Sequence, residues 1–244
     1  MDKSGISRWR QIGETLIGEI ERGDLPADRR LPPSPDLAAR FGVNRHTVLR
    51  ALAHLQSEGF VRMERGRGTY AVVNPLQVRL GPRRWFEQNL AQENRTPSRR
   101  VIAVAVLPAS QAVAEALQIA ASADVAFVTL LGEGNGTPIN FVSNHFPLDR
   151  LPGIDKAFRA YGRESTTDLS FGRIFKSLGV TDFRRKSVRI RSRLPDTEEA
   201  RHLQIAPGDH VLETDVVLVD SSDRPLAYAN TCYPSSRVEF VVDL

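Results

Sequence analysis

The sequence predicts an α+β fold in two domains, and two observations lead to this prediction. The first 74 residues contain three helical patterns followed by two short β-like runs. From residue 101 onward, β-rich runs and turn signals are interspersed with helical patterns. This order favours a mixed, mainly antiparallel sheet over a regular β-α-β series. We therefore predict one domain at 1–74, a linker at 75–100 and a second domain at 101–244.

The composition is that of a globular protein. The chain has 244 residues, of which 41% are hydrophobic and 25% charged, which is enough for two domains with their own cores. No apolar run approaches the roughly 20 residues of a membrane span, and the N-terminal residues lack the apolar segment of a signal peptide. The single cysteine, Cys232, excludes an internal disulfide. We expect a cytoplasmic protein that does not bind a membrane.

Two helices are predicted before residue 42. The first covers about 8–22, because Ser7 can cap it, apolar residues recur on one face and Gly23 can end it. The second is short, at about 35–41. Pro35 lies in its first turn, where a missing backbone N–H has no cost.

A third helix and a hairpin are predicted to follow. Asn44 can cap the helix, because its side-chain oxygen can accept hydrogen bonds from the free amides of the first turn. Gly59 can end it, and its apolar face is formed by Val48, Leu52 and Leu55. The two β-like runs, 60–64 and 69–73, are joined by Arg65-Gly66-Arg67-Gly68.

Basic residues are concentrated in this region. The net charge of +4 is weak evidence by itself, but residues 40–67 hold six arginines against two glutamates. A concentrated basic surface neutralises phosphates and releases counterions. Two helices, a turn and a basic hairpin therefore predict a winged helix-turn-helix, in which the third helix enters the major groove of double-stranded DNA.

The candidate DNA-binding residues lie at the start of the third helix and in the hairpin turn. Arginine can form two parallel hydrogen bonds with guanine, and threonine can meet a thymine methyl group or a phosphate. The alternative is a solvated helix surface, a phosphate brace for His46, and a plain hairpin turn for the glycines. The candidates are Asn44, Arg45, His46, Thr47, Arg50, Arg65, Gly66, Arg67, Gly68 and Thr69.

The second domain is predicted to combine hairpins with short helices. Strands are expected at 101–107, 125–131, 139–146, 182–194, 211–219, 226–233 and 238–242. Helices are expected at 110–119, within 148–162, from Thr166 or Thr167 to Gly179, and at 195–203. The stretch 132–137 (GEGNGT) lacks the lysine and following helix of a phosphate loop and is expected to be a turn. The five histidines and one cysteine do not show metal-ligand spacing, so we expect no metal and no cofactor.

An arginine-rich strand is the second informative stretch. Strict alternation over 183–194 places Arg185, Arg189, Arg191 and Arg193 on one face. This face is either a solvated surface or an anion pocket, because guanidinium groups bind phosphate and phosphonate oxygens in pairs. Ser165 and Thr166 would support an anion if they lie at a helix start, although they could act only as caps.

Several motifs together resemble the GntR superfamily of bacterial transcription regulators, and specifically its HutC-type branch. The motifs are Leu31-Pro32, residues 36–48 (DLAARFGVNRHTV) and 66–70 (GRGTY), then 136–138 (GTP), 144–147 (NHFP) and 223–225 (DRP). Segment 182–190 looks most like the phosphonate-metabolism regulators of this branch. The resemblance implies a winged helix followed by a UTRA effector domain with a chorismate-lyase-like fold. It also implies an effector pocket, for which the candidates are Ser165, Thr166, Arg185, Arg189, Tyr228 and His145.

The chain also departs from the family pattern. Pro35 and Leu49 stand where arginines are common in the family, so base reading depends more on Asn44–Thr47, Arg50 and the hairpin. Sugar-phosphate sensors of the branch usually carry arginines on the strand before the Gly-x-Pro turn. Residues 127–131 carry none, which favours a smaller anion.

These observations predict a ligand-responsive transcription regulator that acts as a homodimer. We expect a repressor that binds operator DNA and is released by a small phosphonate- or phosphate-like anion. The alternatives are a sensor of a sugar phosphate or another metabolite, and a constitutive DNA-binding module. An enzyme acting on a small anionic substrate is disfavoured, because the second domain shows no nucleophile elbow, metal-ligand cluster or nucleotide loop.

Overall fold

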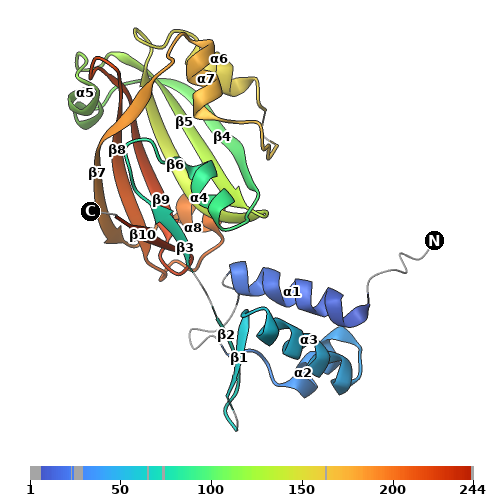
Figure 1. The fold of residues 1–244 in the computed structure, drawn as a ribbon. Helices are drawn as coiled ribbons and strands as arrows, with labels where there is room; N and C mark the ends of the chain where they lie inside the picture. Colours follow the sequence, from blue (N-terminus) through green and yellow to red (C-terminus); the bar gives the residue numbers. More distant parts are fainter. Residues whose placement is uncertain are drawn as a thin grey trace. The chain divides into compact units, whose positions relative to one another are not determined.

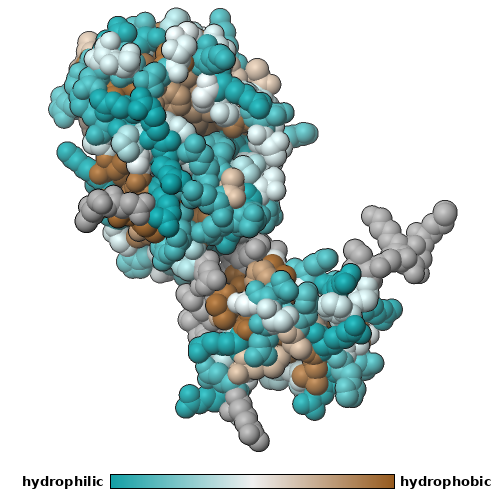
Figure 2. Space-filling view, viewed as in Figure 1, coloured by the Kyte–Doolittle hydropathy of each residue, from teal (hydrophilic) through white to brown (hydrophobic). Residues whose placement is uncertain are grey.

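The structure is a computed structural model that describes residues 7–22, 24, 30–64, 66–72, 75–162 and 164–242, with the backbone alone at 21 and 22. Gly23, Arg65 and Val73, which the sequence assigned to helix and hairpin ends, lie outside the described residues. The chain forms two compact units, Met1–Asn74 and Pro75–Leu244 (Figure 1). In the view of Figure 2, hydrophilic residues cover most of the visible surface of each unit, with small hydrophobic patches between them.

The first unit consists of three helices and a two-stranded hairpin, as the sequence predicted. Its elements are α1 (Arg8–Arg22), α2 (Ser34–Phe41), α3 (Arg45–Ser57), β1 (Val61–Glu64) and β2 (Gly68–Ala71). The hairpin is antiparallel, with Val61 opposite Ala71 and Glu64 opposite Gly68. The predicted apolar face of α3 is buried and packs against α1 and α2.

Two local features fix the turn between α2 and α3. Gly42 adopts the left-handed conformation with φ of 61°, which ends α2 and favours glycine. Asn44 then caps α3, because its Oδ1 accepts a hydrogen bond from the backbone N of Thr47 at 2.8 Å. The opposite, exposed side of α3 is therefore held at a fixed angle to α2.

The second unit is built on a six-stranded antiparallel sheet in the order β4-β5-β6-β9-β8-β7 (Figure 1). A small parallel pair, β3 with β10, lies outside this sheet. The strands are β3 (Leu76–Arg79), β4 (Pro97–Pro108), β5 (Asp124–Gly134), β6 (Thr137–Pro147), β7 (Phe183–Arg193), β8 (Val211–Asp220), β9 (Pro225–Pro234) and β10 (Val238–Val241). The helices are α4 (Phe86–Gln92), α5 (Gln111–Leu117), α6 (Ile154–Arg159), α7 (Phe171–Ser177) and α8 (Thr197–Leu203).

Helices pack on both faces of the sheet. On one face, α6 and α7 enclose the main core, in which Phe146, Phe158 and Phe175 are fully buried. On the other face, α5 packs through Val113 and Leu117, and α8 packs through Leu203, as separate clusters. Among the described residues, the longest and most apolar helices still fall short of what a bilayer crossing needs.

The prediction of a linker at 75–100 is wrong. Leu76 and Val78 of β3 pack with Phe86 and Leu90 of α4 in a core of their own, and β4 already begins at Pro97. This core could not be predicted from local sequence patterns, because β3 has only four residues and pairs with β10, which is about 160 residues away. The β3–α4 segment therefore belongs to the second unit.

The predicted helix start at Thr166 or Thr167 is also wrong. Helix α7 begins at Phe171, and its N-cap residue is Ser170. Thr166 instead forms an isolated β-bridge with Arg99 of β4, with both N···O distances at 2.8 Å. The free amides of a helix start are therefore not available at Ser165 and Thr166.

Strict alternation along the arginine-rich strand fails at a β-bulge. Arg185 lies opposite Leu218, and Ser187 lies opposite Val217, so one extra residue of β7 is inserted between them. This insertion reverses which side chains share a face. Arg185 consequently lies on the face of Val188, and Arg189, Arg191 and Arg193 lie on the opposite face, so the prediction that all four share one face is wrong.

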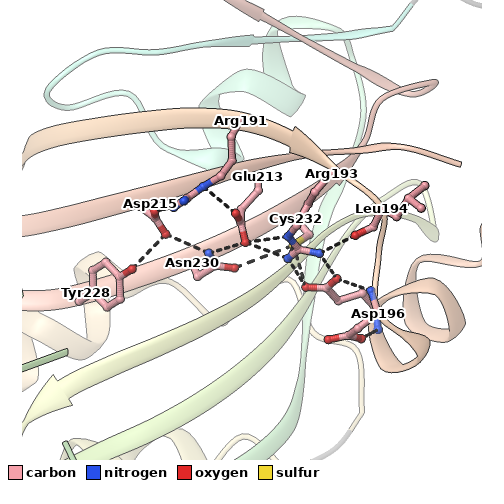
Figure 3. A network of polar contacts seen from close by, with 10 residues as sticks. Arg191, Arg193, Leu194, Asp196, Glu213, Asp215, Tyr228, Asn230 and Cys232 are labelled. Carbon is pink, nitrogen blue, oxygen red and sulfur yellow. Dashed lines mark hydrogen bonds and ion pairs between the residues drawn. The ribbon is translucent and has the colours of Figure 1, made fainter. Parts of the chain in front are cut away.

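On that opposite face, arginines and carboxylates form a network that joins β7, β8, β9 and α8 (Figure 3). Arg193 donates two hydrogen bonds to Glu199, at 2.6 and 2.7 Å, and two to Glu213 Oε1, at 2.9 and 2.8 Å. Cys232 donates from Sγ to Glu199 Oε1 at 2.9 Å. Arg191 pairs with Glu213 and Asp215. Each buried carboxylate therefore has a cationic partner.

The network changes the pKa of Glu199. Burial alone would raise this pKa, but hydrogen bonds from Arg193, from Cys232 and from the backbone of Asp196 lower it from 4.5 to about 2. Because the pKa is lower in the folded state, the carboxylate stabilises the fold above its ordinary pKa. This contribution is lost as the pH falls from about 4.5 towards 2.

We expect Arg193→Gln to lower the free energy of unfolding at pH 7 by about 3–5 kcal/mol, because it leaves a buried carboxylate without its cation. The acid-induced loss of stability should also begin at a higher pH in the variant, since burial then raises the pKa of Glu199. Denaturant unfolding between pH 2 and 7 measures both effects. The matched control is Arg173→Gln, which removes an exposed arginine that pairs with exposed Asp168. Identical pH profiles for the wild type and Arg193→Gln would contradict the assignment.

Candidate nucleic-acid interface and effector cavity

The predicted DNA-binding residues of α3 lie together on its solvent-exposed side. Arg45, His46 and Arg50 are exposed, and Thr47 is half-buried. Their side of the helix is opposite to the buried side formed by Val48, Ala51, Leu52 and Leu55. This arrangement presents cationic and polar groups along one helix, which is what entry into a major groove requires.

Contacts with α1, with α2 and with the helix cap hold three of these side chains in place. Arg45 Nε donates to Ser34 Oγ at the start of α2, at 3.3 Å. The guanidinium carbon of Arg50 lies 4.9 Å from the ring centre of Trp9 on α1. The hydroxyl of Thr47 donates to Asn44 Oδ1 at 2.9 Å, so Asn44 and Thr47 also serve as the cap. Such bracing reduces the side-chain entropy that binding would otherwise remove.

The hairpin turn presents a second basic surface. Gly66 and Gly68 have φ of 76° and 123°, which other residues rarely adopt. A Cβ at position 68 would also lie 2.9 Å from Arg30 Nε, so the side chain of Arg30 would have to move. Arg67 is exposed, and Arg65 lies outside the described residues. A shallow depression on this hairpin is lined by Arg30, Arg62, Glu64, Gly66, Arg67 and Tyr70.

Arg62 is a cationic group of this surface that the sequence prediction missed. Its guanidinium lies 5.3 Å from the ring centre of Tyr70 and 2.7 Å from Glu64 Oε1. The sequence places Arg62 and Glu64 on the same face of one predicted strand. It does not show that Tyr70 lies directly opposite Arg62, because this depends on the register of the hairpin.

The second unit contains a cavity between its sheet and the segment that carries α4. The solvent-accessible volume is about 80 Å³, several times what one water molecule needs. The floor is formed by side chains of β6, β8 and β9 that point to one face, and the walls come from 80–86, β4, β7 and α7. The lining mixes aromatic rings with polar groups and contains two arginines, Arg99 and Arg185.

Arg99 is a buried cation, with 6% of its surface exposed. Its Nε donates to Glu87 Oε1 of α4 at 3.0 Å. Its guanidinium lies over two rings, 4.6 Å from the centre of Phe86 and 5.3 Å from that of Phe171. One carboxylate and two aromatic faces therefore hold Arg99 at the cavity wall.

Arg185 is held differently, by backbone carbonyl groups. Its Nη1 donates to the carbonyl oxygens of Gly81, at 3.0 Å, and of Arg84. Its guanidinium also lies 4.7 Å from the ring centre of Trp85. Burial lowers the pKa of Arg185, the charges of Tyr233 and Glu87 partly oppose this shift, and the positive charge of Arg99 adds a smaller lowering. Carbonyl dipoles and a ring do not neutralise a full charge, so the cavity has an excess of positive charge.

Polar groups complete the cavity floor. Asn140, Asn144, Thr214, Thr231 and Tyr233 line it. Burial raises the pKa of Tyr233, although Arg185 and Arg99 partly oppose this shift, so the phenol is neutral at pH 7. Asn140 Oδ1 is buried and, within the part of the chain that the structure describes, lacks a hydrogen-bond partner. Such a floor can donate to and accept from a polar organic ligand.

The six residues predicted for one effector pocket do not lie together. Arg185 lines the cavity, whereas Arg189, Tyr228 and His145 lie on the opposite face of the sheet. The bulge in β7 separates Arg189 from Arg185, and Tyr228 and His145 alternate with cavity-lining residues along β9 and β6. There, Tyr228 donates to Asp215 Oδ1 at 3.0 Å. The residues Ser165 and Thr166 lie along β4, where Ser165 donates to Glu133 Oε2 at 2.6 Å.

Sequence reasoning missed most of the cavity. Arg99, Trp85 and Phe86 all fall within the predicted linker. Asn140 and Tyr233 lie on predicted strands, but their orientation depends on the register. Among the described residues, groups of three or more His, Cys, Asp or Glu side chains that could hold a metal ion are absent.

Comparison with known proteins is consistent with both surfaces. Residues 9–71 match the family model of bacterial regulatory proteins of the gntR family, and residues 92–239 match that of the UTRA domain. An uncharacterised HTH-type transcriptional regulator of Rhizobium meliloti, RB1450, is 32% identical over 240 residues, which cover 98% of this chain and 96% of that protein.

Other relatives and solved structures agree with this result. The probable transcriptional regulator PhnF of Escherichia coli is 26% identical, covering 97% of this chain and 95% of that protein. The transcriptional repressor NagR of Bacillus subtilis is 25% identical, covering 98% and 95%. The crystal structure of PhnF from Mycobacterium smegmatis shares the fold, with a TM-score of 0.64, 21% identity, and coverage of 96% and 98%.

The resemblance found in the sequence, the α+β fold and the class of the protein are thereby confirmed. The matching proteins are transcription regulators and not enzymes. The UTRA match alone covers more than half of the chain. The chain belongs to the GntR family of bacterial transcription regulators, in the HutC-type branch that carries a UTRA domain.

Proposed function

We propose that this regulator binds operator DNA through α3 and the β1–β2 hairpin, and that a small anionic metabolite in the cavity of the second unit releases it. The observation that carries the proposal is a pair of arginines on the wall of one cavity, the buried Arg99 and the half-buried Arg185. The name of NagR, a transcriptional repressor, supports repression as the direction of control.

Arg45 is the strongest candidate for base recognition. It is the first residue of α3, and the N-terminal residues of a recognition helix contact base edges. Its hydrogen bond to Ser34 leaves other N–H groups of the guanidinium available for guanine. Arg50, stacked on Trp9, is better placed for a phosphate, because its bracing by α1 directs it to the side of the helix.

A phosphate- or phosphonate-like group fits the charge of the cavity. Glu87 pairs with Arg99, whereas the side chain of Arg185 donates its hydrogen bonds, within the described part of the chain, to backbone carbonyl groups. The planar fork of arginine bonds two oxygens of such an anion, and burial strengthens the attraction. An apolar part of the ligand can lie against Trp85 and Phe86, which line the same cavity.

A sugar phosphate is the second candidate. The hydroxyl and amide groups of Asn140, Asn144, Thr214 and Thr231 favour it, since they can bond to hydroxyl groups of a ligand. The absence of arginines from residues 127–131 disfavours a sugar phosphate, because sugar-phosphate sensors of the branch usually carry arginines on this strand. The two candidates share the anionic group that would meet Arg99 and Arg185.

Arg185 offers a route from the cavity to the DNA-binding unit. The carbonyl groups that it holds belong to residues 81 and 84, a few residues after the chain leaves the first unit. An anion that takes over the guanidinium would compete with these carbonyls and free the segment. Effector and DNA would then weaken each other's binding by the same factor.

We also propose that the protein is a homodimer. A regulator of this class reads two half-sites, and a symmetric pair provides one recognition helix for each. The dimer predicts operators with inverted repeats.

We expect Arg45→Ala to weaken specific DNA binding by about 1–3 kcal/mol, the usual loss for a bidentate base contact. Fluorescence anisotropy with a duplex selected from a random pool measures the affinity. The control is Arg159→Ala, which removes an equal charge from an exposed site on α6. If both variants bind as tightly as the wild type, α3 is not placed in the groove as proposed.

We expect one of inorganic phosphate, methylphosphonate or a hexose 6-phosphate to raise the melting temperature and to lower operator affinity. Arg185→Met and Arg99→Met should each abolish the thermal shift, because each removes a cation from the cavity. The matched control is Arg189→Ala, on the opposite face of the same strand, which should keep the shift. A shift that survives both methionine variants would show that the ligand binds elsewhere.

For the dimer, we expect light scattering of the full chain at micromolar concentration to give twice the mass of one chain. This mass is expected without operator DNA, because the proposed pairing of the two chains does not depend on DNA. A monomer mass under these conditions would contradict the proposal.

A further inference from the structure

Leu49 lies on the exposed side of the recognition helix, where the charged and polar candidates also lie. It is 38% exposed and does not belong to the buried side of α3. The helical spacing places it one turn after Arg45 and three residues after His46. The middle of the proposed DNA-contacting surface is therefore apolar.

The two arginines near Leu49 on this helix contact other helices. Arg45 is hydrogen-bonded to α2 through Ser34, and Arg50 is stacked on α1 through Trp9. Neither contact covers Leu49, which remains exposed. The methyl groups of Leu49 are thus available to a ligand that approaches this side of α3.

We propose that Leu49 is a specificity-determining residue that recognises the 5-methyl group of a thymine in the major groove. The inference rests on the proposed placing of α3 in that groove. Leucine has no hydrogen-bond donor or acceptor, so it can select a base only through an apolar contact. Among the four bases, thymine alone presents a methyl group there. A guanine or cytosine would leave its polar edge unpaired against the leucine.

This contact distinguishes Leu49 from an ordinary surface leucine. Single exposed apolar residues are common on soluble proteins and often have no role. An ordinary surface leucine would make DNA affinity independent of any single methyl group. If Leu49 recognises a base, the DNA affinity depends on one methyl group in each half-site.

The experiment starts from duplexes that the full-length protein selects from a random pool in the absence of added anions. Each thymine of the selected half-site is replaced in turn by deoxyuridine, which lacks only the 5-methyl group. We expect one position at which the replacement weakens wild-type binding about fourfold, the factor for burying one methyl-sized group. At that position, cytosine should bind weakly, and 5-methylcytosine should recover part of the affinity.

Two variants assign the effect to Leu49. Leu49→Ala should bind the thymine and deoxyuridine duplexes equally, and Leu49→Arg should select guanine at the same position. Ile190→Ala, which truncates an exposed residue of β7 in the other unit, should keep the wild-type preference. Equal deoxyuridine effects in the wild type and Leu49→Ala, or an unchanged base preference in Leu49→Arg, would overturn the inference. The Arg45→Ala variant tests separately whether α3 lies in the groove. If Arg45→Ala weakens DNA binding but the Leu49 experiment fails, only the inference about Leu49 is overturned.

Discussion

One extra residue in β7 determines how the second unit uses its arginines. The bulge between Arg185 and Ser187 reverses the alternation of the strand, so that Arg185 points into the cavity and Arg189, Arg191 and Arg193 point away from it. Without the bulge, Arg185 would lie on the face that carries the carboxylate network, and the cavity would lose one of its two cations. β-Bulges often re-aim a side chain next to a functional site, and the placing of this one is consistent with that role.

The two faces treat positive charge in opposite ways. On the network face, Arg191 and Arg193 meet Glu199, Glu213 and Asp215, so the charges are compensated within the protein and stabilise the packing of α8. On the cavity face, the guanidinium of Arg185 contacts carbonyl groups and an aromatic ring, and Arg99 pairs with one carboxylate, Glu87. Compensated arginines serve stability, whereas incompletely compensated ones remain able to attract an anion. The proposed effector site follows from this contrast more than from the number of arginines.

The sequence predicted the first unit well because its signals are local. The cap at Asn44, the apolar spacing of α3 and the glycines of the hairpin all act within a few residues. The second unit was predicted less completely where long-range pairing decides the outcome. Strand β3 depends on distant β10, Thr166 pairs with Arg99 instead of starting a helix, and the bulge of β7 is defined only by its pairing with β8. These errors concern segments next to the cavity, whose walls include residues 80–86, Arg99 of β4 and Arg185 of β7.

The way in which Arg185 is held has a consequence for control. The Nη1 group of Arg185 already bonds to the carbonyls of Gly81 and Arg84, so an anion that takes Nη1 as well must replace these carbonyls. The free energy of binding is then reduced by the cost of freeing segment 81–84, and this cost is the coupling between the cavity and the start of the second unit. A ligand that contacts Arg99 but leaves Arg185 on its carbonyls would bind without changing the segment. Such a ligand would occupy the cavity and leave DNA binding as it was, because only differential contacts shift an equilibrium.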